Sequence, residues 1–116
     1  MLRQLLLRVA MLMAVAGLPV ASAAPLKLLG FDDMSCPAWV KSKEDGDQRK
    51  LYIVWIRGLL SGHNYANQSH QVSAISSGTI EQYVNRYCTE KPVGDFSEAA
   101  LRLSDQFSGR DAPISK

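Results

Sequence analysis

The residues of this chain that could do chemistry are two cysteines, two histidines and a short run of amides. Catalysis needs a nucleophile, an acid–base pair or a phosphate cradle at a defined spacing. The sequence contains no His-Glu-x-x-His zinc motif, no Gly-x-Ser-x-Gly nucleophile elbow and no glycine-rich phosphate loop. We therefore predict that the protein is not an enzyme and uses no cofactor.

The histidines and amides lie close together in the sequence. His63 and His70 are seven residues apart, which would place them on one face of a helix that continued through both. Two ligands without a third are a weak basis for a metal site, so we expect no metal. We expect these side chains to meet solvent, to cap a helix or to contact a protein partner. The candidates for partner binding are His63, Asn64, Asn67, Gln68 and His70.

The first 23 residues have the order of a secretory signal peptide. Arg3 and Arg8 precede an apolar run at 9–20, and residues 21–23 are the small sequence Ala-Ser-Ala. The apolar run is shorter than the roughly 20 residues that span a membrane, although an uncleaved anchor is the alternative. We expect cleavage after Ala23, a periplasmic location and no membrane contact thereafter.

Cys36 and Cys88 are the cysteines of the sequence. In an exported chain such a pair predicts a disulfide. The bond would close a loop of roughly 50 residues and contribute about 4 kcal/mol in the chain-entropy model. A redox or metal pair is the alternative, but there is no Cys-x-x-Cys motif and both histidines are distant in sequence.

The charges of the mature chain balance. Two of the 13 basic residues lie in the first 23 positions, so 11 remain against 11 acidic residues. A near-neutral domain lacks the electrostatic reason to bind nucleic acid or an anionic membrane. We therefore expect a protein partner.

Apolar residues at helical spacing predict an all-α domain at 35–108, between an N-terminal arm at 24–34 and a flexible tail at 109–116. Four helices are expected: 36–43, 48–65, one from Gly78 or Thr79 that stops before Pro92, and one that follows Asp95. Capping boxes are expected at Thr79/Gln82 and at Asp95/Glu98. A strand at 51–56 is the alternative for part of the second helix.

The second helix is apolar nearly all round, which predicts a central helix that others cover. Yet Gly58, Ser61 and Gly62 form a strip of small residues beside Trp55, and each interior glycine costs roughly 1 kcal/mol relative to alanine. We expect this strip to be a helix-packing motif, on which another helix or a large ring lies. The alternative is an open strip that receives a partner.

Four short motifs occur in order along 36–103, with Pro92 before the last of them: Cys36-Pro-Ala-Trp39, Trp55-Ile-Arg-Gly58-Leu-Leu-Ser61-Gly62-His-Asn64, Tyr83-Val84-Asn-Arg-Tyr87-Cys88 and Phe96-Ser-Glu-Ala99-Ala100. Together they resemble the Tai-type family of periplasmic immunity proteins, which protect bacteria against type VI secretion amidase effectors. That family is similar in layout to the acid-stress chaperone HdeA. The resemblance implies a small HdeA-like bundle of about four helices with one disulfide. The chain departs from the family at Leu59, where an aromatic is common, and at Tyr83, where a tryptophan is common.

The resemblance implies a periplasmic immunity protein that binds and inhibits a peptidoglycan amidase effector. Such an inhibitor needs an exposed loop or helix end, and the segment 63–77 is our candidate for it. One alternative is an HdeA-like acid-stress chaperone, which would act as a dimer that opens on acidification. Another is an envelope binding protein with a different partner. A homodimer is a further expectation.

The leader makes one prediction that can be tested directly. Protein recovered from the exported fraction should begin at or near Ala24, because signal peptidase cleaves after the small-residue triplet. Intact-mass spectrometry of that fraction measures the N-terminus. Recovery of the chain with Met1 still attached would contradict cleavage.

Overall fold

The computed structural model describes residues 24–109, which form a helical bundle. Its elements are α2 (Cys36–Lys41), η1 (Ser42–Glu44), α3 (Gly46–Ala66), η2 (Gln68–His70), α4 (Ser77–Glu90) and α5 (Phe96–Phe107), of which η1 and η2 are single 3₁₀ turns. The expected all-α fold is confirmed, and the strand considered at 51–56 is wrong because α3 runs through it. The expected signal peptide at 1–23 and the end of the tail at 110–116 lie outside the described residues.

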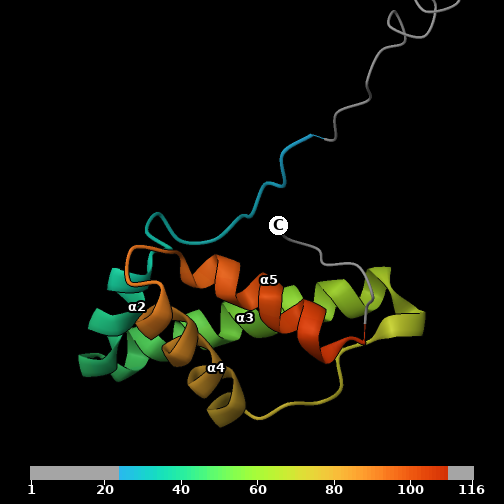
Figure 1. The fold of residues 1–116 in the computed structure, drawn as a ribbon. Coiled ribbons are helices and arrows are strands. Elements are labelled where there is room, and N and C mark those ends of the chain that lie inside the picture. Colours follow the sequence, from blue (N-terminus) through green and yellow to red (C-terminus); the bar gives the residue numbers. More distant parts are fainter. Residues whose placement is uncertain (1–23, 110–116) are drawn as a thin grey trace, which may run out of the picture.

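The bundle is organised around α5. This helix packs against both α3 and α4, and α2 packs against α4. Figure 1 shows α5 running along α3, with α2 at one end of the molecule and the connection from α3 to α4 at the other. One end of α3 therefore lies beside α2, and the other end leads into the connection to α4. The polar segment predicted for function is at this second end.

Side-chain caps account for where the first two α-helices, α2 and α3, begin. The Ser35 hydroxyl accepts a hydrogen bond from the Ala38 backbone N–H at 3.2 Å, with Pro37 in the first turn of α2. The Asp45 carboxylate accepts from the Gln48 N–H at 3.2 Å, so α3 begins at Gly46, two residues before the prediction. The first helix was predicted to extend to residue 43. In the structure α2 ends at Lys41, and the 3₁₀ turn η1 follows it.

Both expected capping boxes are wrong. The cap of α4 is Ser76, whose hydroxyl accepts from the Thr79 N–H at 3.1 Å, so Thr79 is inside the helix rather than at its cap. Asp95 does precede α5, but its side chain makes no cap hydrogen bond. The start of α5 is held instead by backbone pairing, in which the Phe96 N–H donates to the Met34 carbonyl at 2.9 Å.

The disulfide clamps three helix ends together. Cys36 and Cys88 are bonded, with their Cα atoms 5.3 Å apart, as predicted. Beside this bond the Cys36 N–H donates to the Gly94 carbonyl at 2.8 Å, and Ser35 and Asp95 form an antiparallel bridge. The clamp thus joins the start of α2, the end of α4 and the start of α5.

An aromatic group fills the core next to the clamp. Trp39 and Phe96 are fully buried, and their ring centroids lie 5.9 Å apart. Tyr52 from α3 lies 4.6 Å from Phe96, so rings from three helices meet. The indole N–H of Trp39 donates to the Asn85 side-chain oxygen at 2.8 Å, which satisfies its buried polar atom.

Arg49 is a structural residue that the sequence analysis missed. Its side chain is nearly buried, and its guanidinium lies 3.9 Å from the centroid of the Trp39 ring. The guanidinium donates to the Trp39 carbonyl at 2.7 Å and to the Ser42 hydroxyl at 2.7 Å, and it pairs with Glu81 at 2.5 Å. A buried cation is tolerated because each of these acceptors replaces lost hydration. Arg49 therefore ties the end of α2 to α3 and α4.

The predicted helix-packing motif is not a contact within residues 24–109. Gly58, Ser61 and Gly62 are exposed, and a Cβ atom built on either glycine meets nothing within 4 Å. The expectation of a close helix contact is therefore wrong, and the strip is open. Trp55, the fourth residue of the motif, is half-buried and packs edge-on against Phe96 at 6.1 Å.

Of the glycines in the described residues, Gly30 in the N-terminal arm has the closest neighbours. A Cβ atom there would lie 2.8 Å from Nε1 of Trp55 and 2.6 Å from the sulfur of Met34. The same indole nitrogen donates to the Leu29 carbonyl at 2.7 Å, and Phe31 packs edge-on against Tyr52 at 4.8 Å. The part of the arm at 29–34 is therefore held against α3.

This contrast predicts opposite effects for two alanine substitutions. Gly30→Ala should lower the free energy of unfolding by about 1–2 kcal/mol, because the added methyl displaces the Trp55 ring. Gly58→Ala should raise it by roughly 0.5–1 kcal/mol, because alanine favours the helix and meets no neighbour. Urea unfolding of dilute protein measures both. A destabilising Gly58→Ala would show that the strip is covered in the monomer.

Candidate partner-binding surface

The candidate surface begins where α3 ends. Asn67 is the C-cap of α3, and its backbone and side-chain N–H groups donate to the His63 carbonyl at 2.9 and 3.1 Å. Such bonds satisfy a carbonyl that the helix itself leaves unpaired. The chain then makes the turn η2 and continues through 71–76 to the cap of α4. We call the connection 67–76 the α3–α4 loop.

Asn64 fixes the middle of the α3–α4 loop. Its side-chain oxygen accepts from the Val72 N–H at 2.7 Å, and its side-chain nitrogen donates to the Val72 carbonyl at 3.0 Å. The amide therefore pairs with one residue's backbone in both directions, as a neighbouring strand would. Val72 is buried, so this pairing also satisfies backbone groups that have little access to water.

Arg57 fixes the end of the same loop. Its guanidinium donates to the Ile75 carbonyl and to the Ser77 hydroxyl, both at 3.1 Å. These groups lie just before and at the start of α4. The α3–α4 loop is thus held to α3 at three places, by Asn67, Asn64 and Arg57.

His63 is buried, which corrects the expectation that it meets solvent. It is only 7% exposed, because it follows Ile56 and Leu60 on the inner face of α3 at spacings of seven and three. Its Nδ1 lies 3.3 Å from the Asn64 side-chain oxygen, and its Nε2 is buried without a hydrogen-bond partner. His63 therefore belongs to the core.

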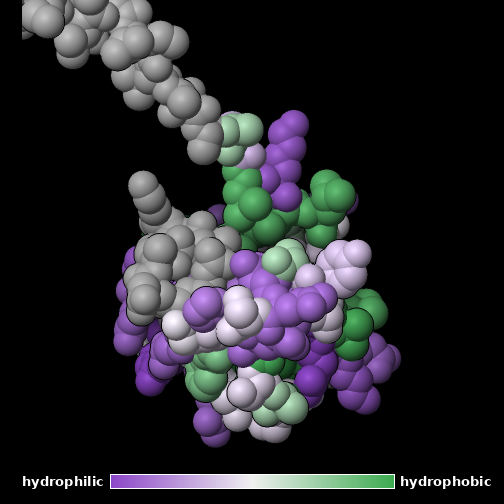
Figure 2. Space-filling view, turned by 90° about the vertical axis from the view of Figure 1, so that its right-hand side faces the viewer, coloured by the Kyte–Doolittle hydropathy of each residue, from purple (hydrophilic) through white to green (hydrophobic). Residues whose placement is uncertain are grey.

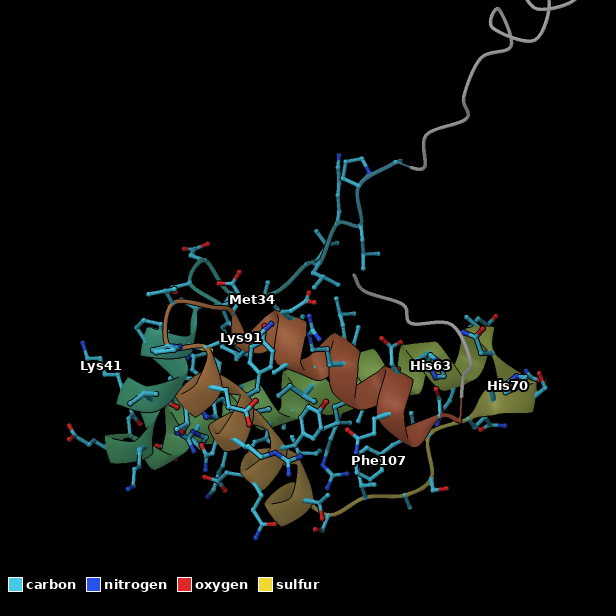
Figure 3. The ribbon with its side chains drawn as sticks, viewed as in Figure 1. Met34, Lys41, His63, His70, Lys91 and Phe107 are labelled. Atoms are coloured by element: carbon cyan, nitrogen blue, oxygen red, sulfur yellow. A yellow bond between two sulfur atoms is a disulfide. The ribbon has the colours of Figure 1, made fainter. Side chains whose placement is uncertain are left out.

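His70 and His63 do not share a helix face, because α3 ends at Ala66 between them. Figure 3 shows both at the same end of the molecule, away from Lys41, with His70 on η2. Within residues 24–109 no group of three or more candidate ligands could hold a metal ion. The side chain of His70 is exposed, and its Nδ1 lies 3.2 Å from the Ser69 hydroxyl.

The structure divides the five candidate residues into two groups. Asn64, Asn67 and His63 position the loop or fill the core, whereas Gln68 and His70 are exposed on η2. Beside the loop is a groove of about 240 Å³, lined by Arg57, Leu60, Ser61, Asn64 and residues 72–75. Figure 2 views this end of the molecule and shows a mostly hydrophilic surface. The exposed part of the candidate surface is therefore polar.

A second surface is apolar, and sequence analysis identified only its strip of small residues, through the alternative that the strip is open to a partner. The expectation that α3 is covered all round is wrong, since Leu51, Val54 and Tyr65 are 52%, 62% and 84% exposed. These residues lie on one side of α3 with the open strip between them. We call the set the outer face of α3: Leu51, Val54, Gly58, Ser61, Gly62 and Tyr65. The helical period could have shown that these residues share a side, but not that nothing covers it.

Another hollow of the described residues is lined by polar groups with structural roles. One of about 590 Å³ lies near α2 and is lined by Asp33, Lys41, Asp45 and others. Hydrogen bonds from the Ser35 side chain and backbone hold the pKa of the Asp33 carboxyl below its ordinary value. Asp45 caps α3. Two of the carboxylates that line this hollow, Asp33 and Asp45, are therefore already used in hydrogen bonds to the backbone.

Two tyrosines on α4 have perturbed ionisation. Burial raises the pKa of the Tyr83 and Tyr87 phenols. A raised phenol pKa moves each group further from ionisation near neutral pH, so neither is activated as a base. The expectation that the protein is not an enzyme stays a prediction.

The chain matches no protein-family model, no curated protein and no solved structure. The resemblance to the Tai-type family therefore stays a prediction. In the described range 24–109, no helix combines the length and the apolar character that a membrane span requires.

The role of Asn64 can be tested by amide exchange. Asn64→Ala should accelerate hydrogen exchange at the Val72 amide by about tenfold or more, because the N–H loses its acceptor. Asn64→Asp keeps an acceptor but loses the donor to the Val72 carbonyl, so its effect should be smaller. Gln68→Ala, on the same loop, is the matched control and should change nothing at Val72. Unchanged protection in Asn64→Ala would show that the loop is held by other contacts.

Proposed function

We propose that the protein is a periplasmic immunity protein that binds and inhibits a type VI secretion peptidoglycan amidase. The observation that carries the proposal is the α3–α4 loop, an exposed polar segment held to a rigid helix by side chains of that helix. Asn64 pairs with Val72, and Arg57 holds Ile75. A loop ordered in the free protein loses less conformational freedom on binding, which favours tight association.

The chemistry of the loop suits a protein partner. Gln68 and His70 can donate and accept hydrogen bonds from an exposed position. The neighbouring groove has the Ser61 hydroxyl and the Arg57 guanidinium along its wall. Polar groups next to a shallow groove are typical of surfaces that dock on another protein. An inhibitor needs only to cover the enzyme's active site, so it requires no catalytic group of its own.

The class of partner comes from the sequence resemblance. Residues from three of the four motifs that carry it have structural roles: Trp39 and Phe96 lie in the core, and Cys36 and Cys88 form the clamp. A disulfide is typical of proteins from oxidising compartments, which agrees with a periplasmic location. These features support an exported binding domain, and the amidase is the partner that the motifs imply.

The second candidate is an acid-stress chaperone, and the exposed apolar side of α3 is the observation that favours it. Leu51, Val54 and Tyr65 are more than half exposed there, and an apolar surface of this kind can receive an unfolded client. The disulfide would hold the chain together if the bundle opened in acid. The two candidates therefore differ in the pH at which the protein works.

Inhibition of the amidase tests the proposal. The purified protein, added in equimolar amount to the type VI amidase of the same genome, should stop its release of peptides from peptidoglycan at pH 7. The double variant Gln68→Arg/His70→Glu should inhibit at least tenfold less well, because it alters the exposed part of the loop. Val93→Glu is the matched control, since Val93 is 97% exposed and outside the loop.

Two results would contradict the proposal. One is full amidase activity in the presence of a tenfold excess of the protein. The other is equal inhibition by the loop variant and the parent, which would move the binding surface elsewhere. Suppression of aggregation of an unfolded client at pH 2–3, without amidase inhibition, would identify the chaperone instead.

A further inference from the structure

The outer face of α3 is unusual for the surface of a monomer. Between Leu51 and Tyr65 it contains no charged residue, and its three large side chains are more than half exposed. A Cβ atom at Gly58 or Gly62 would meet nothing within 4 Å. A contiguous apolar stretch of this kind marks an interaction surface. The amphipathic pattern of a fully solvated helix would place charges there.

The outer face is also complementary to itself. Leu51 and Tyr65 each lie seven residues from Gly58, in opposite directions, while Val54 and Gly62 each lie four residues from it. If two copies of α3 pack antiparallel with their Gly58 residues facing each other, Val54 lies over Gly62 of the other copy. Leu51 then lies over Tyr65 of the other copy. Each large aliphatic side chain therefore faces either a glycine, as Val54 does, or an aromatic ring, as Leu51 does.

We propose that the outer face of α3 is a homodimer interface, in which two copies pack antiparallel about a two-fold axis at Gly58. A two-fold interface uses the same patch on both copies, so each contact occurs twice. The missing side chains at Gly58 and Gly62 let the helix backbones approach closely enough for the flanking side chains to interlock. This role accounts for glycines that the monomer does not use. The inference goes beyond the proposed function and does not depend on it.

Charge favours the antiparallel arrangement. About the Gly58 axis, Lys50 lies opposite Ala66 of the other copy, and Arg57 lies opposite Leu59. A parallel arrangement would instead bring Lys50 next to Lys50 and Arg57 next to Arg57. Like charges at close range oppose association. Antiparallel helices also bring opposite ends of their dipoles together.

The size of the face indicates a weak, reversible association. A helix the length of α3 is about 30 Å long. We estimate that its outer face would bury roughly 500 Å² per copy, which gives about 1,000 Å² for the dimer and lies at the lower limit of specific interfaces. Interfaces at this limit are typical of transient complexes, so we expect a reversible dimer that forms in the micromolar range.

Charge substitutions on facing positions test both the surface and its register. Leu51→Glu and Tyr65→Lys each place one charge in the interface, and both sites are exposed in the monomer. Within one chain the two positions lie about 21 Å apart along α3 and cannot pair. Across the antiparallel interface they face each other. An equimolar mixture of the two variants therefore restores one apolar pair and adds one ion pair.

Sedimentation velocity on the purified, disulfide-bonded protein across 1–300 µM measures the association. The parent should approach the mass of a dimer, each single variant should dimerise at least fivefold more weakly, and the mixture should recover association. Gly62→Leu should also weaken association at least fivefold, because its side chain fills the place that Val54 of the other copy would occupy. Val93→Glu should associate like the parent. Circular dichroism confirms that each variant is folded.

Three outcomes would overturn the inference. A parent that stays monomeric at 300 µM would show that the outer face does not bind a second copy. Single variants that dimerise as well as the parent would place the interface on another face. A mixture that associates no better than its components would exclude the antiparallel register. None of these outcomes depends on amidase inhibition, so this inference and the proposed function can fail separately.

Discussion

The covalent bond between Cys36 and Cys88 is the constraint on which the rest of the structure depends. It brings together the start of α2 and the last turn of α4, two segments 52 residues apart in sequence. The backbone pairing of 34–36 with 94–96 then extends this junction to the start of α5. A domain of this size buries a limited core, and a closed loop of roughly 50 residues removes about 4 kcal/mol of chain entropy from the unfolded state.

The aromatic core depends on this junction for its geometry. Trp39 lies three residues after one cysteine, and Phe96 lies eight residues after the other. Both are therefore delivered to one place, where they meet Tyr52 of α3. Arg49 completes the arrangement from the same helix, because it binds the carbonyl of Trp39 and stacks on its ring. The far end of α3 has no such junction, and hydrogen bonds from Asn64 and Arg57 organise it instead.

Local patterns predicted the parts of the fold that local physics determines. The helical period placed all four helices, and the presence of two cysteines in a chain with a signal-like leader predicted the disulfide. The cap of α4 was assigned to Thr79 because its spacing to Gln82 fits a capping box, whereas Ser76 lies three residues earlier and makes the bond. Spacing alone does not decide between neighbouring hydroxyl residues, because the choice depends on where the preceding loop ends.

The site was harder to predict because burial depends on tertiary packing. His63 and His70 are the same residue type, yet only His63 is buried. α3 continues for three residues beyond His63, to Ala66, and this helix directs His63 into the core. The glycines of α3 indicated a side of the helix that another backbone can approach closely. The sequence could not show whether that neighbour belongs to the same chain. Arg49 gave no local signal at all, because its partners come from α2, η1 and α4.

The two tryptophans have a spectroscopic consequence. Both indole N–H groups are bonded, Trp39 to Asn85 and Trp55 to the carbonyl of Leu29. Trp39 is fully buried, whereas Trp55 is half-buried beneath the N-terminal arm. Intrinsic fluorescence therefore reports two separate events: release of the arm changes the surroundings of Trp55, and loss of the core changes those of Trp39. A variant that keeps either tryptophan alone would resolve the order in which the arm and the bundle open.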